Sequence, residues 1–73
     1  MMGLQEQFLH SMIKANIPAT FYLLNGYQMK GTVKAYDDEA IFVESSGCYQ
    51  MVFKHALSTI MPHRRVTVDA DLD

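Results

Sequence analysis

The sequence lacks most of the features that mark secreted, fibrous or membrane-spanning proteins. Its 73 residues include one cysteine, no tryptophan and only two prolines. Cys48 has no partner for an internal disulfide, which excludes a disulfide-stapled scaffold and favours a reducing compartment. No apolar run approaches the ~20 residues that span a bilayer, and the N-terminal stretch before Lys14 is not the pattern of a signal peptide. We therefore expect a cytoplasmic protein with no membrane segment.

Charge is also scarce, and it is nearly balanced. Six Lys and Arg residues against eight Asp and Glu residues give a net charge of −2 at pH 7. Three of the eight acids are Asp69, Asp71 and Asp73, so the rest of the chain carries six positive and five negative charges, a net of +1. This argues against a nucleic-acid binder that relies on a broad basic face. Any nucleic-acid binding should draw more on stacking and on hydrogen bonds to base edges.

Motifs for catalysis, metal binding and nucleotide hydrolysis are missing as well. The sequence contains no glycine-rich phosphate-binding motif, and its three histidines and Cys48 do not fall at zinc-ligand spacing. A thiolate-imidazole pair of Cys48 and His55 also needs an orienting group and a sizeable cleft, which so short a chain can hardly supply. The adjacent acids of residues 37–39 fit a solvated turn. We expect no enzyme activity, no cofactor and no metal site.

Hydrophobic periodicity predicts one helix near the N-terminus. Between Gln5 and Ala15 the apolar residues follow one stripe with the helical period of about 3.6 residues. Asn16 and then Pro18 mark its end, because a proline ring disfavours helical geometry at the preceding residue.

Five short strands are predicted after the helix, separated by turn residues. The strands are Ala19–Leu24, 27–35, Ala40–Glu44, Cys48–Phe53 and Leu57–Met61. Asn25-Gly26 suits a tight hairpin turn, and Ser45-Ser46-Gly47 has the composition of another turn.

The second of these strands alternates clearly between apolar and polar residues. We expect one face to be buried, formed by Tyr27, Met29, Gly31, Val33 and Ala35. Because Gly31 interrupts that face, it predicts a sharp bend, a bulge or a close backbone approach.

The predicted fold is mainly β with one N-terminal helix, a strongly bent five-stranded antiparallel sheet or open barrel. Residues 1–66 form one domain, and residues 67–73 form a short acidic tail that we expect to be disordered. A sheet that does not close has two edges, and an edge such as Tyr49–Phe53 aggregates unless it is paired. Pairing with a neighbouring copy, repeated around an axis, predicts a closed ring.

Several sequence features together resemble a known family. They are the helix, Asn25-Gly26, Gly31, Asp37 and the segment Phe53-Lys54-His55-Ala56. On these residues the chain resembles Hfq, the bacterial member of the Sm and Sm-like RNA-binding family. The first Sm motif is matched by residues 24–26, Gly31 and Asp37, and the second by residues 53–59. The resemblance covers about residues 4–62.

The resemblance implies both a fold and a function. Hfq proteins place a helix on a bent five-stranded sheet, and six copies form a ring by pairing their fourth and fifth strands. Family members are RNA chaperones that pair small regulatory RNAs with messenger RNAs. We therefore expect a cytoplasmic homohexamer that acts in post-transcriptional regulation. The alternative is a structural or protein-interaction ring with little RNA affinity, suggested by the net charge of −2.

On the proximal face, around the pore, the family binds uridine-rich RNA. Gln5, Lys54 and His55 match the residues that contact it, although Lys54 and His55 could instead merely fill and solvate a pore. Asp38 and Glu39 stand where the family usually has a polar residue followed by a stacking residue. A carboxylate has no π face and repels phosphate, so we expect weak uridine binding.

On the distal face, the family binds adenine-rich RNA in pockets between the first two strands and the neighbouring subunit. A base can stack on a tyrosine ring, and the Gln50 amide can read an adenine edge by two hydrogen bonds. Alternatively, Tyr22 and Met29 are ordinary sheet residues that cover the core. The matching or nearby residues are Tyr22, Asn25, Gly26, Tyr27, Gln28, Met29, Lys30, Gln50 and Thr59. We expect adenine-rich RNA to be the preferred ligand.

The outer rim of the ring is a third RNA surface in many family members. It relies on an arginine cluster at the end of the helix, where this chain has one cation, Lys14. Tyr36 matches an aromatic residue often found at that rim. We expect weak annealing activity along it.

Overall fold

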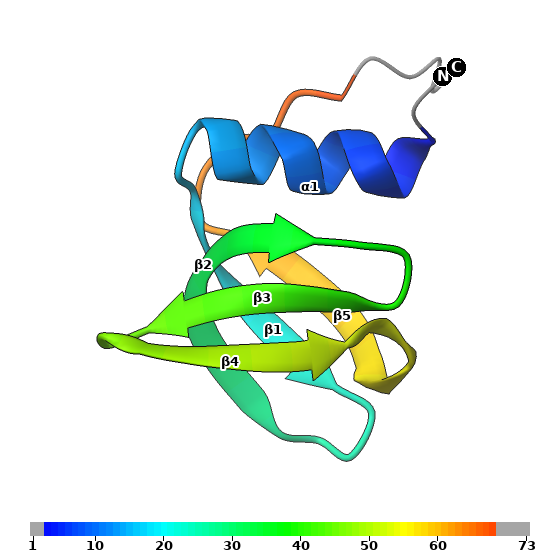
Figure 1. Ribbon diagram of the computed structural model, residues 1–73, viewed down its shortest axis with the longest axis vertical. Helices are drawn as coiled ribbons and strands as arrows, with labels where there is room; N and C mark the ends of the chain where they lie inside the picture. Colours follow the sequence, from blue (N-terminus) through cyan, green and yellow to red (C-terminus); the bar gives the residue numbers. More distant parts are fainter. Residues whose placement is uncertain (1–2, 69–73) are drawn as a thin grey trace.

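The helix and the five strands follow one another along the chain in the expected order (Figure 1). The computed structural model describes residues 3–68. A 3-10 turn, Lys54–Ala56, joins the last two strands. The elements are α1 (Leu4–Lys14), β1 (Pro18–Leu23), β2 (Gln28–Tyr36), β3 (Ala40–Ser45), β4 (Cys48–Phe53) and β5 (Leu57–Pro62). The ends of each element lie within one residue of those predicted from the sequence.

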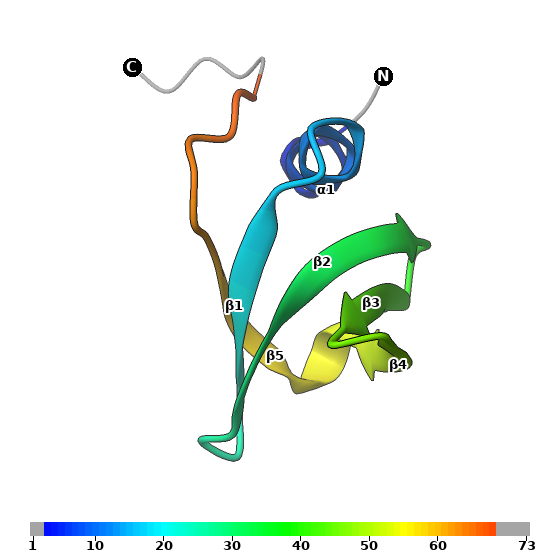
Figure 2. The same ribbon diagram turned by 90° about the vertical axis from the view of Figure 1, so that its left-hand side faces the viewer.

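The five strands form one antiparallel sheet in the order β4-β3-β2-β1-β5. Figure 2 shows that the sheet is strongly bent, with β1 and β5 on one side, β3 and β4 on the other, and β2 curving between them. A side chain at Gly31 would collide with the backbone carbonyl of Glu44 and the side chain of Val43. The predicted close backbone approach at Gly31 is therefore confirmed. β4 and β5 are the two edges of the sheet.

The core lies between α1 and one face of the sheet. Leu9 and Met12 of α1 are fully buried against Phe21, Val33 and Val43 from three strands. At the start of the helix, the Glu6 carboxylate accepts a hydrogen bond from the backbone N–H of Gly3 at 2.9 Å. This bond pairs a backbone N–H group that has no partner within the helix, and it places negative charge at the positive end of the helix dipole. Among the described residues, no helix is long and apolar enough to cross a membrane.

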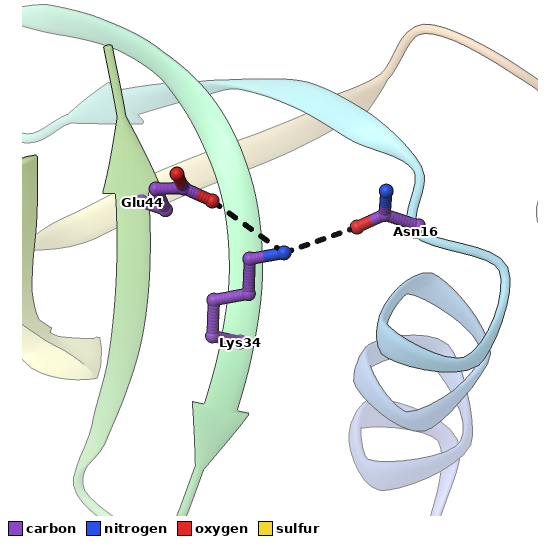
Figure 3. Close-up of polar contacts among 3 residues, drawn as sticks. All are labelled: Asn16, Lys34 and Glu44. Carbon is purple, nitrogen blue, oxygen red and sulfur yellow. Dashed lines mark hydrogen bonds and ion pairs between the residues drawn. The ribbon is translucent and has the colours of Figure 1, made fainter. Parts of the chain in front are cut away.

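A polar contact holds the end of α1 against β2 and β3 (Figure 3). Asn16 has a φ of 52°, a left-handed conformation that asparagine tolerates better than most residues. Lys34 Nζ donates to Asn16 Oδ1 at 3.2 Å and lies 3.5 Å from the Glu44 carboxylate. Because Lys34 and Glu44 are each more than a third exposed, this ion pair stabilises the fold by only about 0–1 kcal/mol. Its local consequence is that the charge of Lys34 is balanced by Glu44.

The expected alternation of β2 is wrong at both of its ends. The pairing of β2 with β3 shifts register between Val33 and Ala35, where β2 has an irregularity. Val33 is buried as expected, but Ala35 is exposed and Tyr36 takes the half-buried position. Tyr27 precedes the strand and is 67% exposed. A one-residue slip in a strand turns every later side chain to the other face, which explains the change at Ala35.

Residues 67–73 were expected to form a disordered tail, but the structure describes the chain as far as Val68. Residues 63–68, which we name the C-terminal strap, run back along α1 on the side away from β2 (Figure 2). The backbone N–H of His63 donates to Pro18 O at 2.9 Å, and Ser11 Oγ donates to Thr67 O at 2.8 Å. Val66 packs against the core. The three acids of the predicted tail, Asp69, Asp71 and Asp73, lie outside the described residues.

Candidate nucleic-acid interface

The 3-10 turn between β4 and β5 gathers most of the residues predicted for the proximal face. Asp38, Glu39, Phe53, Lys54 and His55 line one open hollow of about 500 Å³, which we name the proximal hollow. The 3-10 turn is held to the loop between β2 and β3 because the backbone N–H of Lys54 donates to Glu39 O at 2.8 Å. The Phe53 and His55 rings stack with centroids 5.8 Å apart. Four of the five predicted proximal residues therefore share one hollow.

The fifth predicted proximal residue, Gln5, lines a neighbouring groove of about 270 Å³. Lys54 lines both hollows, so it connects the groove beside the first turn of α1 to the hollow beside the 3-10 turn. Thr59, which was predicted for the distal face, also lines this groove and lies opposite Tyr22 in the pairing of β1 with β5.

The Lys54 ammonium lies over an aromatic ring. Its Nζ atom is 5.7 Å from the centroid of Tyr36, a distance at which a cation is attracted to the face of the ring. The Tyr36 hydroxyl donates to Glu6 O at 3.2 Å, which connects this ring to α1. Tyr36, which was predicted at the rim, therefore contacts both Lys54 and the first turn of the helix.

The acidic turn before β3 contains one carboxylate with a shifted pKa. Asp37 Oδ1 accepts hydrogen bonds from the backbone N–H groups of Glu39 and Ala40 at 2.8 and 2.9 Å. These bonds, and to a lesser degree the nearby positive charge of Lys54, lower the pKa of Asp37 below its ordinary value of 3.8. Asp37 thus shapes the turn. Within residues 3–68 the exposed carboxylates of Asp38 and Glu39 have no hydrogen bond or ion pair, so they present negative charge to the proximal hollow.

The predicted distal residues of β1 and β2 surround a tight hairpin. Asn25 Oδ1 accepts a hydrogen bond from the Tyr27 backbone N–H at 2.9 Å, and Gly26 has a φ of 89°. This conformation favours glycine and confirms the expected role of Asn25-Gly26 in the turn. The Tyr27 side chain, which is 67% exposed, directly follows this turn.

The register of β1 and β2 separates the other distal residues onto two faces. Tyr22 lies opposite Gln28, and Thr20 lies opposite Lys30. Met29 instead lies opposite the buried Phe21 and packs against the core. Met29 therefore does not share a face of the sheet with Tyr22.

Gln50 lies on β4, away from the β1–β2 hairpin. β3 and β2 separate β4 from β1 in the sheet, so Gln50 and Tyr22 are not neighbours within one chain. Gln50 is exposed at the sheet edge. A pocket that contains both residues requires a second copy next to this edge.

Sequence reasoning missed Arg64 as a partner of the helix end and Arg65 as a neighbour of Lys14. The strap carries them back to α1, where Arg64 donates to Ala15 O and Asn16 O at 3.2 and 3.3 Å. Arg65 lines the same groove as Lys14. The two consecutive arginines are visible in the sequence, but no local pattern shows that residues 63–68 fold back onto the helix.

Comparison with known proteins identifies the family. The family model described as "Hfq protein" matches residues 4–67. The chain belongs to the Hfq family. It is 46% identical over 68 residues to the RNA-binding protein Hfq of Desulfitobacterium hafniense (strain DSM 10664 / DCB-2), covering 93% of this chain and 82% of that protein. It is 51% identical over 66 residues to the RNA-binding protein Hfq of Symbiobacterium thermophilum, covering 90% and 73% of the two chains.

A solved Hfq structure has the same fold. A crystal structure of the pleiotropic translational regulator Hfq superimposes with a TM-score of 0.79 at 32% sequence identity, covering 81% of this chain and 98% of that one. The predicted fold class, one N-terminal helix followed by a bent five-stranded antiparallel sheet, is therefore confirmed.

Proposed function

We propose that this chain is a non-enzymatic RNA-binding protein that acts as an RNA chaperone in post-transcriptional regulation. Its membership of the Hfq family carries this proposal, because the relatives described above are named RNA-binding proteins. In the proposed role it binds small regulatory RNAs and messenger RNAs in the cytoplasm and needs no cofactor or metal. The single cysteine, Cys48, is free and exposed, in keeping with a reducing compartment.

The functional unit in this proposal is a ring of six copies. The support is the pair of free edges, β4 and β5, and the apolar side chains that gather on them. Tyr49, Met51 and Phe53 of β4 and Met61 of β5 are each about half exposed or more. A sheet edge with such residues is an aggregation site unless another strand covers it. Pairing β4 of one copy with β5 of the next covers both edges and brings Gln50 toward a neighbouring hairpin.

Adenine-rich RNA is the ligand that the predicted distal residues favour. The observation that carries this preference is the exposed Tyr27 ring beside the hydrogen-bonded Asn25-Gly26 turn. An exposed aromatic ring gives a base a stacking surface, and an amide such as that of Gln50 can make two hydrogen bonds to adenine. Stacking of this kind does not need the broad basic face that the chain lacks.

Uridine-rich RNA binds the proximal hollow weakly in this proposal. Lys54 and His55 offer donors there, but Asp38 and Glu39 line the same hollow with unpaired carboxylates. Ionised carboxylates act only as acceptors and repel the phosphates of an incoming strand. The proximal hollow should therefore bind uridine-rich RNA more weakly than the distal residues bind adenine-rich RNA.

A second candidate function is a structural or protein-interaction ring with little RNA affinity. The unpaired acids of the proximal hollow favour it. A filter-binding titration of the full chain with short adenine-rich and uridine-rich RNAs separates the two functions. Tight binding of the adenine-rich RNA supports the RNA-binding proposal, and failure to bind either RNA at micromolar protein would contradict it.

A further inference from the structure

Lys54 lines the proximal hollow together with two acids, yet it pairs with neither of them. Asp38 and Glu39 are exposed residues whose carboxylates belong to the same hollow. An ammonium beside free carboxylates commonly forms an ion pair with one of them. Within residues 3–68, however, Lys54 Nζ forms no hydrogen bond or ion pair. Another contact therefore sets the direction of the Lys54 side chain.

That contact is the ring of Tyr36 at the end of β2. The Lys54 Nζ atom lies 5.7 Å from the centroid of the ring, within the ~6 Å at which a cation is attracted to a ring face. The ring is neutral, so an ammonium held on it keeps its net positive charge. An ammonium also has three N–H donors, and a single ring face does not engage all of them. On the Tyr36 ring, Lys54 therefore remains available to an anion.

Three separate contacts hold the Tyr36 ring in this place. In the register of β2 and β3, Tyr36 lies opposite Ile41. The half-buried ring packs against the core. Its hydroxyl donates to Glu6 O at 3.2 Å, in the first turn of α1. The sheet, the core and the helix thus all act on the position of the Lys54 ammonium.

The backbone of Lys54 is held independently of its side chain. Its N–H donates to Glu39 O at 2.8 Å, which keeps the 3-10 turn beside the acidic turn whatever the ammonium contacts. The Asp37 carboxylate accepts two backbone hydrogen bonds within that acidic turn. Among residues 3–68 the carboxylates of Asp38 and Glu39 have no partner, so they compete with the Tyr36 ring for the ammonium.

We propose that Tyr36 is a positioning residue for the proximal hollow: its ring holds the Lys54 ammonium away from the free carboxylates and so keeps this charge available to an RNA phosphate. The choice of RNA rests on the proposed function. Tyr36 acts here through Lys54 and needs no contact with RNA of its own. Without the ring, we expect Lys54 to pair with Asp38 or Glu39. The summed charge of the hollow is then unchanged, but its lysine is bound to an acid, and uridine-rich RNA binds even more weakly.

The first test observes the ring contact directly and needs no RNA. An aromatic ring shifts the NMR resonances of protons over its face, so the Hε protons of Lys54 report whether the ammonium lies on Tyr36. The full chain is prepared with isotope-labelled lysine, and Lys54→Gln identifies the resonance. Tyr36→Phe keeps the ring and should keep the shift, whereas Tyr36→Leu should lose it. An unchanged Lys54 resonance in Tyr36→Leu overturns the proposal.

The second test measures whether Tyr36 acts through Lys54. Oligouridine is titrated with the full chain and followed by NMR, so that weak binding is measurable. Tyr36→Leu is expected to weaken binding several-fold, whereas Tyr36→Phe, the matched control, keeps the ring and should bind nearly as well as wild type. In a Lys54→Gln background, Tyr36→Leu should cause no further loss, because the side chain that it positions is gone. Equal losses in the two backgrounds would show that Tyr36 does not act through Lys54, and the proposal fails.

A third comparison removes the competing acids. In an Asp38→Asn/Glu39→Gln background, Lys54 has no free carboxylate of the hollow to pair with, so Tyr36→Leu should lose its effect on oligouridine binding. A purely structural role gives the same loss with and without the acids, and that outcome also overturns the proposal. Circular dichroism checks that each variant is folded. If Tyr36→Leu is unfolded, pentafluorophenylalanine at position 36 replaces it in every comparison, because it keeps the size of the ring but removes the negative face.

Adenine-rich RNA is titrated in parallel to separate this proposal from the proposed function. Normal adenine-rich binding, together with an unchanged Lys54 resonance or equal oligouridine losses in the Lys54→Gln background, overturns the role of Tyr36 alone. Failure of the wild-type chain to bind either RNA overturns the proposed function, and the role of Tyr36 with it.

Discussion

At the scale of single residues, opposite charges meet in the proximal hollow. In a ring of six, Lys54 supplies six positive charges, and Asp38 and Glu39 supply twelve negative ones, a local sum of −6 with His55 neutral. The carboxylates line the same hollow as Lys54 and have no partner among residues 3–68. Repulsion should therefore exceed attraction for an approaching phosphate.

Replacing Glu39 should restore uridine binding. Glu39→Phe removes a negative charge and adds a stacking surface, and stacking contributes about 1–3 kcal/mol per base. Glu39→Gln removes the charge alone, so the difference between the two variants isolates stacking. Asp38→Gln should give a smaller gain than Glu39→Phe. Oligouridine titrations at one salt concentration measure all four proteins. Tight wild-type binding, or no gain from Glu39→Phe, would show that these residues do not face the RNA.

Removing the exposed ring of Tyr27 should weaken adenine-rich RNA binding. Tyr27→Ala is expected to cost about 1–3 kcal/mol for each base that stacks on the ring. Tyr27→Phe keeps the stacking surface and should bind nearly as well as wild type. The backbone N–H of Tyr27, which donates to Asn25, is present in both variants, so the hairpin is retained. Equal losses for the two variants in an anisotropy titration would contradict a stacking role.

The lowered pKa of Asp37 predicts a loss of stability in acid. Since the folded pKa lies below the ordinary value of 3.8, the ionised carboxylate stabilises the fold above that value. The contribution is lost as the pH falls through the folded pKa. Asp37→Asn keeps an acceptor oxygen but cannot ionise. The stability difference between wild type and this variant, from urea unfolding at fixed protein concentration, should shrink below about pH 4. A difference that stays constant down to about pH 2.5 would disprove the linkage.

At the scale of elements, local residues decide where the helix and strands begin and end. Pro18 begins β1, and the Asn25-Gly26 and Ser46-Gly47 turns separate consecutive strands; both Ser46 and Gly47 have positive φ values. These signals act over a few residues, so the sequence alone locates α1 and the five strands to within one residue. The shift between Val33 and Ala35 depends instead on how β2 pairs with β3, and alternation along β2 cannot reveal it.

The C-terminal strap could not be predicted either, because it depends on contacts between residues that are far apart in the sequence. Its hydrogen bond from Ser11 to Thr67 joins residues 56 positions apart, and Val66 reaches a core built by other elements. Among the predicted site residues, Asp38, Glu39, Lys54 and His55 line one hollow because a short turn and a backbone hydrogen bond bring them together. The groove that contains Lys14 and Arg65 depends on the strap and was missed.

Gly31→Ala should destabilise β2. An added Cβ at this position meets the Glu44 carbonyl and the Val43 side chain, and the carbonyl cannot move without disturbing the sheet. Overpacking of this kind costs about 1–3 kcal/mol. Gly3→Ala is the control, because the nearest atom to its Cβ is a flexible Glu6 carboxylate oxygen at 3.4 Å. Urea unfolding at one protein concentration compares the two variants, and equal stability would contradict the close approach of β2 and β3.

At the scale of the whole molecule, the two free edges of the sheet predict its assembly. β4 and β5 lie at opposite edges, so pairing β4 of one copy with β5 of the next leaves a new free edge at each step. Only closure of the series into a ring covers every edge. A chain of 73 residues also gains from this burial, because a domain of about 60 residues buries only ~60% of its unfolded surface.

The ring should contain six copies in solution. Light scattering coupled to size-exclusion chromatography should give a mass near six times 8.3 kDa. Ile60→Pro removes a backbone donor from β5 and should reduce this mass, because proline is tolerated in a sheet only where its missing N–H is not needed. Ile60 is also paired with Phe21 of β1, so circular dichroism must show that the variant is folded before its mass is interpreted. A wild-type monomer at micromolar concentration would contradict the ring. It would also remove the shared pocket of Gln50 and Tyr22, which one chain cannot form because β2 and β3 lie between their strands.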